Sequence, residues 1–551
     1  AQAPFWLRLR LSGRSSEKFA AMVWPLLPLV VEGVLQPSLA ASLLASWACL
    51  KRGVQPLWGL GLLPAIALLC RARRSIVGPS TKPAGRCGRA EYKAKVEAVE
   101  RVAKQPGPMR MFKATTSNTF RPQQIGARLQ AQSRLDLSGF AHVLEVNMQE
   151  LWVDVEACAT FETFTAECLR DGLVPLVVPE LRTITVGGAI VGIGVESSSF
   201  KHGFFHEGLL EADILLATGE VVTIKPEGQY ADLFQAVPNS LGSFGYLLRL
   251  RMRVQRSKPV IEFQKLWCDS PNDLVAGLEK HCARPELDYV DAVALGDQGG
   301  MLLLGKFVDQ PPVGKTITAY GVWPQFYPSI VREGTEYLRT LDYIWRWDAD
   351  WFWCTQIFPG LRLRLIRWLC GPHMLRSDVY KAFNDTVIKN VLEPLGLNKN
   401  EELVIQDIEI PVANAAKYIH EFLKVCPSQK IGKIKLRRTG KPMTIPIWLC
   451  PVKSRGTPLL PMKAGQLYIN FGFWDALEGP ETKGGMSEGR INKALEDLTQ
   501  KLDGKKSLYS ASYFDEEELY RQYNGAVYKQ VKQKYDPTSR VRGWYERLSK
   551  P

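Results

Sequence analysis

The sequence predicts an α+β protein of two or three domains, preceded by a hydrophobic N-terminal segment. Three observations support this prediction. The chain has 551 residues, more than a single hydrophobic core usually serves. Between about 109 and 254, short β-rich runs are separated by turns and by a helix-like stretch, which favours an α+β domain over a doubly wound sheet. The first 75 residues are rich in apolar side chains.

The apolar N-terminus, residues 1–75, is expected to be a membrane anchor or a leader. Residues 19–50 are apolar except for Glu32, and residues 53–70 carry no charge, a length near the lower limit for a membrane span. Arginines follow the second run, which favours a body on the cytosolic side under the positive-inside rule. One span and two spans both fit. A cleaved signal or a plastid-type leader is the alternative, because its pattern is similar.

The body begins after a linker. Residues 76–104 are predicted to be a segment rich in Gly, Pro and Ser, followed by a helix from Glu91 to Lys104. The first domain, residues 105–256, contains strand-like runs at HVLEVN, LWVDVEAC, DILLATGEVVTI and GYLLRLRMRV. Between the second and third of these lies a helix-like ETFTAECLRDG.

A second domain is expected at residues 257–484. It contains the aromatic run EYLRTLDYIWRWDADWFW, a helix-like ANAAKYIHEFLKV, and strand-like PIWLCP and LYINFGF. Residues 485–551 read as helical with alternating charges, and we expect this segment to pack back on the first domain.

The charge balance and the cysteines restrict the class of partner. Lys and Arg number 70 against 56 Asp and Glu, for a formal charge of +14. The excess is spread along the sequence, so we expect an anionic cofactor and an anionic membrane surface rather than a nucleic acid. Eleven cysteines without a CxxC pair indicate reduced thiols, and six scattered histidines predict no metal centre.

A glycine-rich stretch, TVGGAIVGIGVESSSFKHG at residues 185–203, is the main candidate for binding. It is not a P-loop, and Ser197 stands where a GxGxxG motif needs its last glycine. It also opens no clear helix followed by an acidic residue, which disfavours a Rossmann interpretation. We therefore expect glycine N–H groups around a diphosphate, with serine hydroxyls as further donors and Lys201 as a balancing charge. A tight glycine-bearing strand pair in a core is the alternative.

Two further glycine-bearing loops lie next to strands. AVPNSLGSFGYLL spans residues 236–248, and FRPQQIGARLQ spans residues 120–130. Three such loops are consistent with an extended dinucleotide bound between two small subdomains.

The order of these motifs resembles the PCMH-type FAD domain shared with vanillyl-alcohol oxidase. More narrowly, ESSSFKHG, PELRTITVGG, AVPNSLGSFG, LVIQDIEIP, PIWLCP and FDEEELYRQYNGAVY are together similar to the delta-24-sterol reductases. The resemblance runs from about residue 105 to 535. It implies a two-subdomain FAD-binding domain at 105–256, an α+β substrate or cap domain at 257–484, and a membrane segment at the N-terminus.

The resemblance also implies an activity and its cofactors. Enzymes of this family hold FAD and use NADPH to saturate the side-chain double bond of a sterol intermediate, at the membrane of the endoplasmic reticulum with the body facing the cytosol. The first glycine loop has neither His nor Cys, which implies non-covalent FAD. The family's cofactor positions carry over to Thr185, Val186, Gly187, Gly188, Ala189, Ile190, Val191, Gly192, Ile193, Gly194, Val195, Glu196, Ser197, Ser198, Lys201, Pro238, Ser240, Gly242 and Gly245.

The implied chemistry requires an acid, because an isolated alkene does not accept hydride until it is protonated. We expect Tyr343 to be that acid, polarised by Arg346, with nearby tryptophans stabilising a cation. A buried aromatic cluster is the alternative for this segment. The sterol reductases carry histidines after the tyrosine where this sequence has Trp345 and Trp347. An FAD-dependent oxidase or dehydrogenase acting on an alcohol or hydroxy acid, and a catalytically silent structural subunit, are the alternative functions.

Overall fold

The computed structural model describes residues 85–113, 135–321, 324–348, 376–378, 401–426, 430–435, 442–444, 446–478 and 489–549. Nearly all of them belong to one compact unit made of Pro83–Tyr320, Pro324–Ala349 and Asn400–Pro551. The expected membrane segment, the loop at 120–130, Trp351 and Trp353 lie outside the described residues. Among the helices that are described, none combines the length and the apolar character needed to cross a bilayer.

The first sheet of this unit has six strands and is antiparallel throughout. Its order is β3, β4, β8, β6, β7, with β5 also paired to β8. The strands are β3 (Val143–Asn147), β4 (Trp152–Glu156), β5 (Leu173–Pro175), β6 (Leu209–Leu216), β7 (Val221–Ile224) and β8 (Gly245–Arg256). The alternating β-rich runs predicted all of these strands except β5, so the α+β prediction is confirmed.

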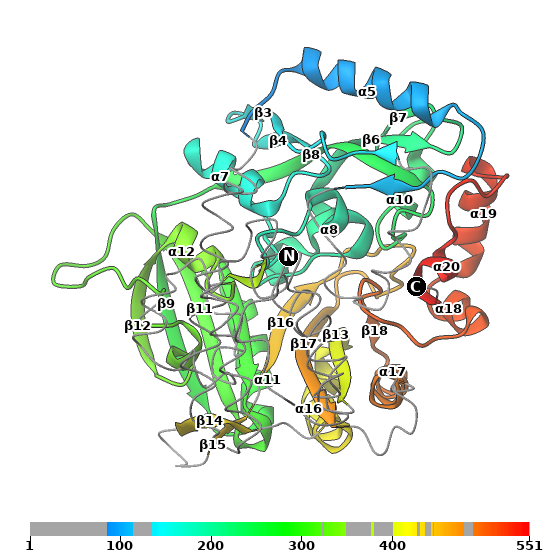
Figure 1. The fold of residues 1–551 in the computed structure, drawn as a ribbon. Coiled ribbons are helices and arrows are strands. Elements are labelled where there is room, and N and C mark those ends of the chain that lie inside the picture. Colours follow the sequence, from blue (N-terminus) through cyan, green and yellow to red (C-terminus); the bar gives the residue numbers. More distant parts are fainter. Residues whose placement is uncertain are drawn as a thin grey trace, which may run out of the picture. The chain divides into compact units, whose positions relative to one another are not determined.

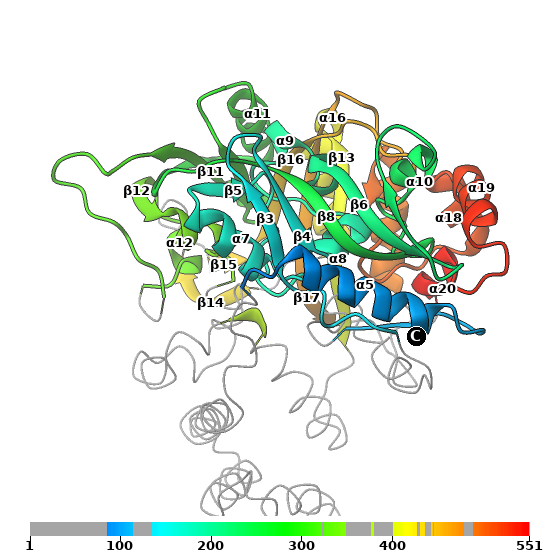
Figure 2. The same ribbon diagram turned by 90° about the horizontal axis from the view of Figure 1, so that it is seen from above.

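Three helices accompany the first sheet, as Figures 1 and 2 show. Helix α5 (Arg89–Ala103) lies across one face, where Tyr92 and Val99 enter a buried cluster with Leu248 of β8. Helix α7 (Phe161–Arg170) and the short α8 (Val186–Gly192) contribute instead to the main hydrophobic core. The helices predicted at Glu91–Lys104 and at ETFTAECLRDG are therefore confirmed.

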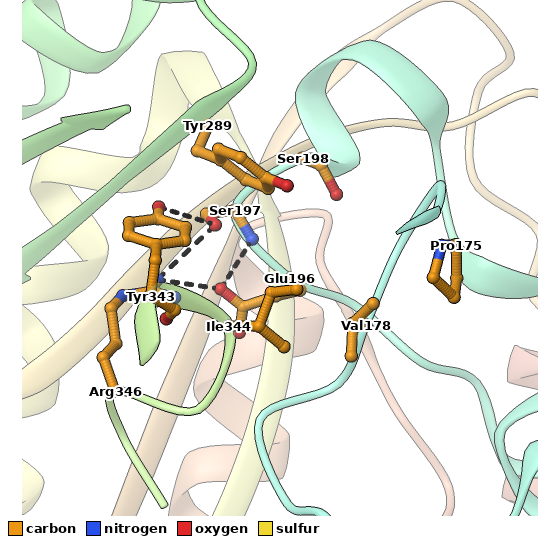
Figure 3. Close-up of a pocket in the computed structure, with 9 residues that line it drawn as sticks. All are labelled: Pro175, Val178, Glu196, Ser197, Ser198, Tyr289, Tyr343, Ile344 and Arg346. Carbon is orange, nitrogen blue, oxygen red and sulfur yellow. Dashed lines mark hydrogen bonds and ion pairs between the residues drawn. The ribbon is translucent and has the colours of Figure 1, made fainter. Parts of the chain in front are cut away.

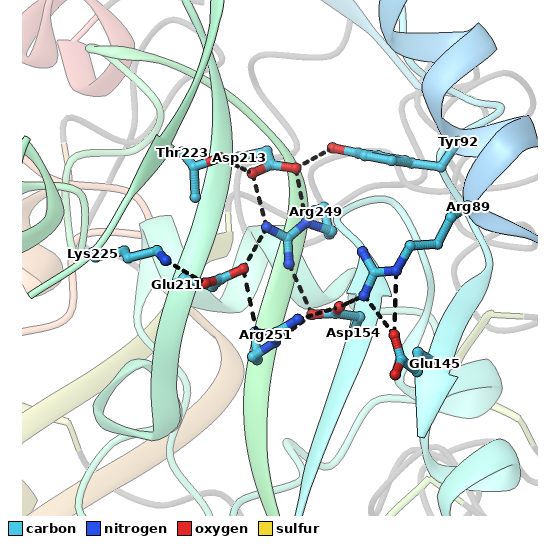
Figure 4. Close-up of polar contacts among 10 residues, drawn as sticks. All are labelled: Arg89, Tyr92, Glu145, Asp154, Glu211, Asp213, Thr223, Lys225, Arg249 and Arg251. Atoms are coloured by element: carbon cyan, nitrogen blue, oxygen red, sulfur yellow. Dashed lines mark hydrogen bonds and ion pairs between the residues drawn. The ribbon is translucent and has the colours of Figure 1, made fainter. Parts of the chain in front are cut away.

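A buried group of charges lies between α5 and this sheet (Figure 4). The guanidinium of Arg249 on β8 contacts three carboxylates, Asp154 at 2.8 Å, Asp213 at 2.8 Å and Glu211 at 2.7 Å. Tyr92 of α5 donates a hydrogen bond of 2.7 Å to Asp213. Buried charges are tolerated only when they are paired and hydrogen-bonded, so Arg249 holds this layer together.

The second sheet has eight strands in the order β12, β9, β11, β10, β16, β17, β13, β18, and all neighbours are antiparallel. Strands β16 and β17 confirm the predictions made from PIWLCP and LYINFGF. The strands are β9 (Val260–Cys268), β10 (Tyr289–Ala294), β11 (Gly300–Val308), β12 (Gly334–Arg339), β13 (Glu401–Pro411), β16 (Ile447–Lys453), β17 (Leu467–Glu478) and β18 (Lys505–Lys506).

The two faces of the second sheet differ in character. Helices α11 (Pro271–Cys282), α16 (Val412–Val425) and α17 (Arg490–Lys501) pack against one face. The opposite face carries polar side chains: Asp407 of β13 is paired with Gly472 of β17, which is paired with Trp448 of β16. Directly paired residues of antiparallel strands share a face, so these three positions form one row across the sheet.

The C-terminal helices return to the six-stranded sheet. They are α18 (Glu516–Gln522), α19 (Gly525–Tyr535) and α20 (Trp544–Ser549). Lys532 donates a hydrogen bond of 2.7 Å to the carbonyl of Ser243, and Tyr535 donates one of 2.7 Å to Asp232. This segment thus closes over the loop that precedes β8.

His206 gives the fold an acid-sensitive contact. It lies in a short 3-10 helix, where its Nε2 is 2.6 Å from the hydroxyl of Thr457 and its ring stacks on Phe204. Burial lowers the pKa of His206 to about 3. In the unfolded protein the pKa of this histidine is near 6.5. Between pH 3 and pH 6.5 the unfolded state therefore binds a proton at this histidine that the folded state does not bind.

We therefore expect the folded state to lose about 1.4 kcal/mol of stability per pH unit as the pH falls from 6.5 towards 3 through this histidine. His206→Gln, which does not titrate, should lose about 2 kcal/mol less than the wild type between pH 7 and pH 5. Urea unfolding at the two pH values measures the difference. Equal losses in the two proteins would contradict the assignment.

Candidate functional site

The glycine stretch forms helix α8 and a serine-bearing turn. The alternative of a strand pair is therefore wrong. The physical reason is close packing: the N–H of Gly187 donates a hydrogen bond of 2.8 Å to the carbonyl of Ala157, and a Cβ at Gly187 would lie 2.8 Å from Ala157 Cβ. The side chain is absent because the helix lies directly on the end of β4.

A lysine side chain places a positive charge at the start of α8. Lys113 Nζ donates a hydrogen bond of 2.9 Å to the hydroxyl of Thr185 and lies 3.9 Å from where a Cβ of Gly188 would be. Small side chains beside a lysine suit a diphosphate, so this part of the protein fits an anionic dinucleotide. Lys113 was not predicted from the sequence, because it belongs to none of the glycine motifs. In the sequence it lies between a two-residue strand and the loop at 120–130.

The serine turn is braced by its own hydroxyls. Ser199 Oγ accepts a hydrogen bond of 3.1 Å from the N–H of Glu196, and Ser198 Oγ donates one of 2.7 Å to the carbonyl of Leu176. Ser197 has a different neighbour, since its Oγ lies 3.3 Å from the hydroxyl of Tyr343 (Figure 3). Its carbonyl accepts a hydrogen bond of 2.7 Å from Val290 of β10, which joins the turn to the second sheet.

The second glycine loop meets the end of α8. The N–H of Leu241 donates a hydrogen bond of 2.8 Å to the carbonyl of Val191. Gly242 and Gly245 adopt φ values of +75° and +156°, which only glycine adopts without strain. The structure thus brings the loop with Pro238, Ser240 and these glycines beside the predicted cofactor stretch.

Lys201 reaches from the serine turn to the loop before β10 of the second sheet. Its Nζ contacts the carbonyl of Leu287 and a carboxylate oxygen of Asp288, both at 3.2 Å, and the side chain is about one-third exposed. Its charge is therefore engaged with the loop before β10.

Arg346 is the centre of the junction between the serine turn and the second sheet. It follows the short helix α12 (Thr340–Ile344) and its side chain is only 1% exposed. One terminal nitrogen lies 2.9 Å from Glu196 of the serine turn and 2.9 Å from Asp291 of β10. The guanidinium also covers the ring of Tyr343 at 4.2 Å. The structure therefore brings the two predicted catalytic residues together with the end of the predicted cofactor stretch.

A small cavity opens at this junction (Figure 3). The enclosed space has room for about one water molecule. The residues that line it are Pro175, Val178, Glu196, Ser197, Ser198, Tyr289, Tyr343, Ile344 and Arg346. Beside it, Glu196 Oε2, Asp291 Oδ1 and Arg346 Nε are buried without a hydrogen-bond partner among the described residues. Buried polar groups are nearly always paired, so these atoms mark a place where a ligand or water completes the hydrogen bonding.

Tyr343 is buried in this junction and holds its proton tightly. Burial raises the pKa of its phenol well above the usual range, with Arg346 acting against the shift. Edge contacts with Phe263 and a close contact with Tyr289 fix the ring. Tyr343 is therefore a weak acid and a rigid part of the cavity wall.

The tryptophans of the aromatic run that the structure describes, Trp345 and Trp347, pack against other side chains of the protein. Trp345 lies under the guanidinium of Arg182 at 5.0 Å, and Trp347 meets the edge of Phe326 at 4.9 Å. Both indoles are almost completely buried. This part of the run agrees with the buried-cluster alternative rather than with a surface for a substrate cation.

Sequence reasoning missed the polar groups of the second sheet. Asp291 accepts a hydrogen bond of 3.0 Å from the indole N–H of Trp448, next to its ion pair with Arg346. Further along the face, Glu409 accepts hydrogen bonds from Ser507 at 2.7 Å and from Asn470 at 3.1 Å. The available signal was the strand LVIQDIEIP, in which acidic residues alternate with isoleucines inside a buried run.

Comparison with known proteins defines the class of the protein. Residues 89–225 match the model of an FAD binding domain, beginning at the first residue of α5. This is the part that holds most of the six-stranded sheet, α8 and the serine turn. The protein thus contains an FAD binding domain.

Curated relatives place it more narrowly. The chain is 26% identical over 411 residues to the Delta(24)-sterol reductase of Homo sapiens, an alignment covering 71% of this protein and 73% of the relative. It is 25% identical over 449 residues to the Delta(24)-sterol reductase of Arabidopsis thaliana, covering 73% and 74%. Cytokinin dehydrogenase 8 of Oryza sativa subsp. indica is 33% identical over 141 residues, 25% of this protein and 26% of the relative. At the level of the family, the protein is related to the Delta(24)-sterol reductases.

Proposed function

We propose that this protein is an FAD-dependent oxidoreductase that uses NADPH to saturate the double bond in the aliphatic tail of a sterol intermediate in sterol biosynthesis. The relatives that align over about 70% of the sequence are named Delta(24)-sterol reductases, which supports the reaction. The single structural observation that carries the proposal is the buried junction around Arg346, where the FAD binding domain meets the polar face of the second sheet.

The proposed cofactor contacts fit FAD held without a covalent bond. Lys113 and the small residues at the start of α8 suit the diphosphate, and the 238–245 loop lies beside the same helix. FAD, when bound, supplies the hydride for the reduction. The protein's own part is to hold the diphosphate, to orient the substrate and to exclude water from the junction. The contacts that we propose are the stretch from Thr185 to Ser198 together with Lys201, Pro238, Ser240, Gly242 and Gly245.

Arg346 and Tyr343 are proposed to shape the reacting end of the site. Arg346 fixes the turn that carries Glu196 and Ser197, and its positive charge compensates two buried carboxylates. Tyr343 presents its hydroxyl to Ser197 at the cavity wall. Both side chains therefore contribute a fixed geometry to the reacting end of the site.

The same proposal includes the domain plan and the location. Residues 105–256 would form the FAD-binding part, 257–484 the substrate part, and 485–551 the closing helical segment. The apolar N-terminus would anchor the protein in the endoplasmic reticulum membrane with its body in the cytosol, or alternatively direct it to another organelle. Flotation of the full-length protein with membranes, followed by protease treatment of sealed vesicles, tests the anchor and the orientation.

Product analysis tests the reaction. The detergent-purified protein is supplied with FAD, NADPH and a sterol with an unsaturated tail, and the sterol is recovered for mass spectrometry. We expect a product with two added hydrogens, one of which becomes deuterium when the reaction runs in D₂O. A product with two hydrogens fewer, formed without NADPH, would instead support an oxidase or dehydrogenase. Unchanged sterol would reject the reductase proposal.

A further inference from the structure

We propose that the side chain of Asp407, positioned by Glu409 through Asn470, is the acid that protonates the substrate alkene. This inference rests on the proposed reductase function and deepens it. The geometry of the second sheet, the lack of a cationic partner among the described residues and the unsatisfied atoms of this group carry the argument.

The first step is placement. Asp407 lies on the polar face of the second sheet, in the same row as Trp448 and on the face from which Asp291 reaches Arg346. A Cβ at Gly472, between them, would lie 3.2 Å from Asp407 Oδ1 and 2.9 Å from Trp448 Cε3. The glycine therefore lets a carboxyl group and an indole meet on the face that the FAD binding domain covers.

The second step is access. Asp407 is half-buried, whereas Glu409 and Asn470 are fully buried. Of these three side chains, Asp407 is the one that reaches an accessible surface. It can therefore touch a substrate, while Glu409 and Asn470 can act only through it.

The third step is charge. Glu196 and Asp291 are both paired with Arg346, but within the described part of the protein no lysine or arginine pairs with Asp407 or Glu409. Their neighbours are the neutral amide of Asn470 and the hydroxyl of Ser507. A buried carboxyl group without a cation keeps its proton, because the charged form is not solvated.

The titration of the pair agrees with this geometry. Burial raises the pKa of Glu409 to about 8, and burial together with the neighbouring Glu409 raises the pKa of Asp407 well above its usual range. The other titratable groups that interact with the pair are Glu180 before α8, Tyr418 of α16 and Tyr523 after α18, and the pKa of each is likewise raised by burial. The whole surrounding therefore favours neutral acids.

The fourth step is the hydrogen bonding left open. Glu409 Oε2 and Asn470 Oδ1 are buried without a partner among the described residues. The amide of Asn470 contacts both carboxyl groups, so its orientation can follow the protons on the pair. The two carboxyl groups, Asp407 and Glu409, therefore hold protons, and Asp407 is the accessible one of the two.

In the reaction, the O–H bond of Asp407 breaks as its proton forms a C–H bond with the less substituted alkene carbon. The electron pair of the double bond supplies that bond, and a tertiary cation is left on the other carbon. The hydride from the proposed reductase reaction completes the saturated product. Asp407 is left as a carboxylate and regains a proton from solvent before the next turnover. A carboxylic acid is the better donor than Tyr343, whose phenol is a far weaker acid.

The test compares Asp407→Asn with Tyr343→Phe and Glu180→Gln in the full-length protein loaded with FAD. We expect Asp407→Asn and Glu180→Gln to be bleached by NADPH at the wild-type rate. Recovery of the flavin spectrum on adding the sterol should slow on the order of 10²–10⁴-fold in Asp407→Asn and by less than about tenfold in Glu180→Gln. Tyr343→Phe, which alters the cavity wall, should slow the recovery less than Asp407→Asn does. Asp407→Glu, which restores an acid, should recover part of the rate and guards against a folding defect of the Asn variant.

A second readout needs neither FAD nor turnover. The infrared spectrum of the protein without sterol should contain the C=O stretches of its neutral carboxylic acids at pH 7, one of which is lost in Asp407→Asn and retained in Tyr343→Phe. In Glu409→Gln the pH at which this band disappears should fall, because the negative neighbour is gone. A purely structural Glu409 would leave that pH unchanged and overturn the positioning role.

The outcomes separate the two proposals. A wild-type flavin that NADPH bleaches and the sterol restores, with Asp407→Asn restored equally fast, overturns only the assignment of Asp407. A rate lost in Glu180→Gln or Tyr343→Phe instead transfers the role to that residue and also overturns it. A wild-type flavin that no sterol restores rejects the reductase function, and the proton-donor role with it.

Discussion

Arg346→Met is expected to destabilise the protein by about 3–5 kcal/mol and to abolish reduction of the sterol. The methionine leaves Glu196 and Asp291 buried without their cation, and breaking a buried ion pair from one side costs this much. The serine turn then loses its buried ion pair with the second sheet, so FAD retention should fall as well. The urea midpoint and the flavin content of the purified variant measure the two effects.

Lys201→Met is the matched control, because Lys201 joins the same turn to the loop before β10 through an ion pair of 3.2 Å. That pair is partly exposed to solvent, so its loss should cost no more than about 1 kcal/mol. Arg346→Lys should fall between the two, since lysine keeps the charge but loses the second hydrogen bond of the guanidinium, to the carbonyl of Tyr343. A fully stable Arg346→Met variant with normal flavin content would contradict the role of this junction.

Arg249→Met is expected to destabilise the protein by a similar amount and to change its stability alone. The substitution removes the cation that contacts Asp154, Glu211 and Asp213 beneath α5. At least one buried carboxylate must then take up a proton or stay unpaired, at a cost of about 3–5 kcal/mol. Thermal or urea unfolding of the flavin-loaded protein measures the loss.

Arg251→Met provides the comparison on the same strand. Arg251 also contacts Asp154, at 2.9 Å, but its side chain is 25% exposed and lies over Trp152. We expect a loss of about 1 kcal/mol for this variant. Equal losses for the two arginines would show that burial does not set the size of the effect.

The strands and long helices were predictable because their signals are local. The alternation in HVLEVN and GYLLRLRMRV gives a period of two, and the helix at ANAAKYIHEFLKV gives apolar residues at helical spacing. The order of the second sheet was not predictable, because β10 is paired with β16, a strand far away in the sequence. Nothing local specifies such pairs.

Helix α8 shows why a glycine-rich segment misleads. Two adjacent glycines normally argue against a helix, but at Gly187 the contact with Ala157 requires a residue without a side chain. Tertiary packing therefore overrides local propensity. The same holds for the serines, since two of the three hydroxyls brace the turn.

Part of the site could be predicted from the sequence, and the rest could not, again for a physical reason. Tyr343 and Arg346 stand in a conspicuous aromatic run, and the glycine loops mark places where backbone must approach closely. Their partners Asp291 and Asp407 lie inside buried strands whose acidic residues look like isolated polar positions. Only the fold shows that they share a face with Trp448.

The flavin spectrum of the detergent-purified full-length protein tests the proposed function most directly. NADPH is added without oxygen, followed by a sterol with an unsaturated tail. We predict a flavin band that is bleached by NADPH and restored by the sterol in the wild type, and a greatly reduced flavin band in Arg346→Met. A protein that binds FAD but is not restored by any such sterol would contradict the reductase, and a protein that takes up no FAD would contradict the flavoenzyme itself.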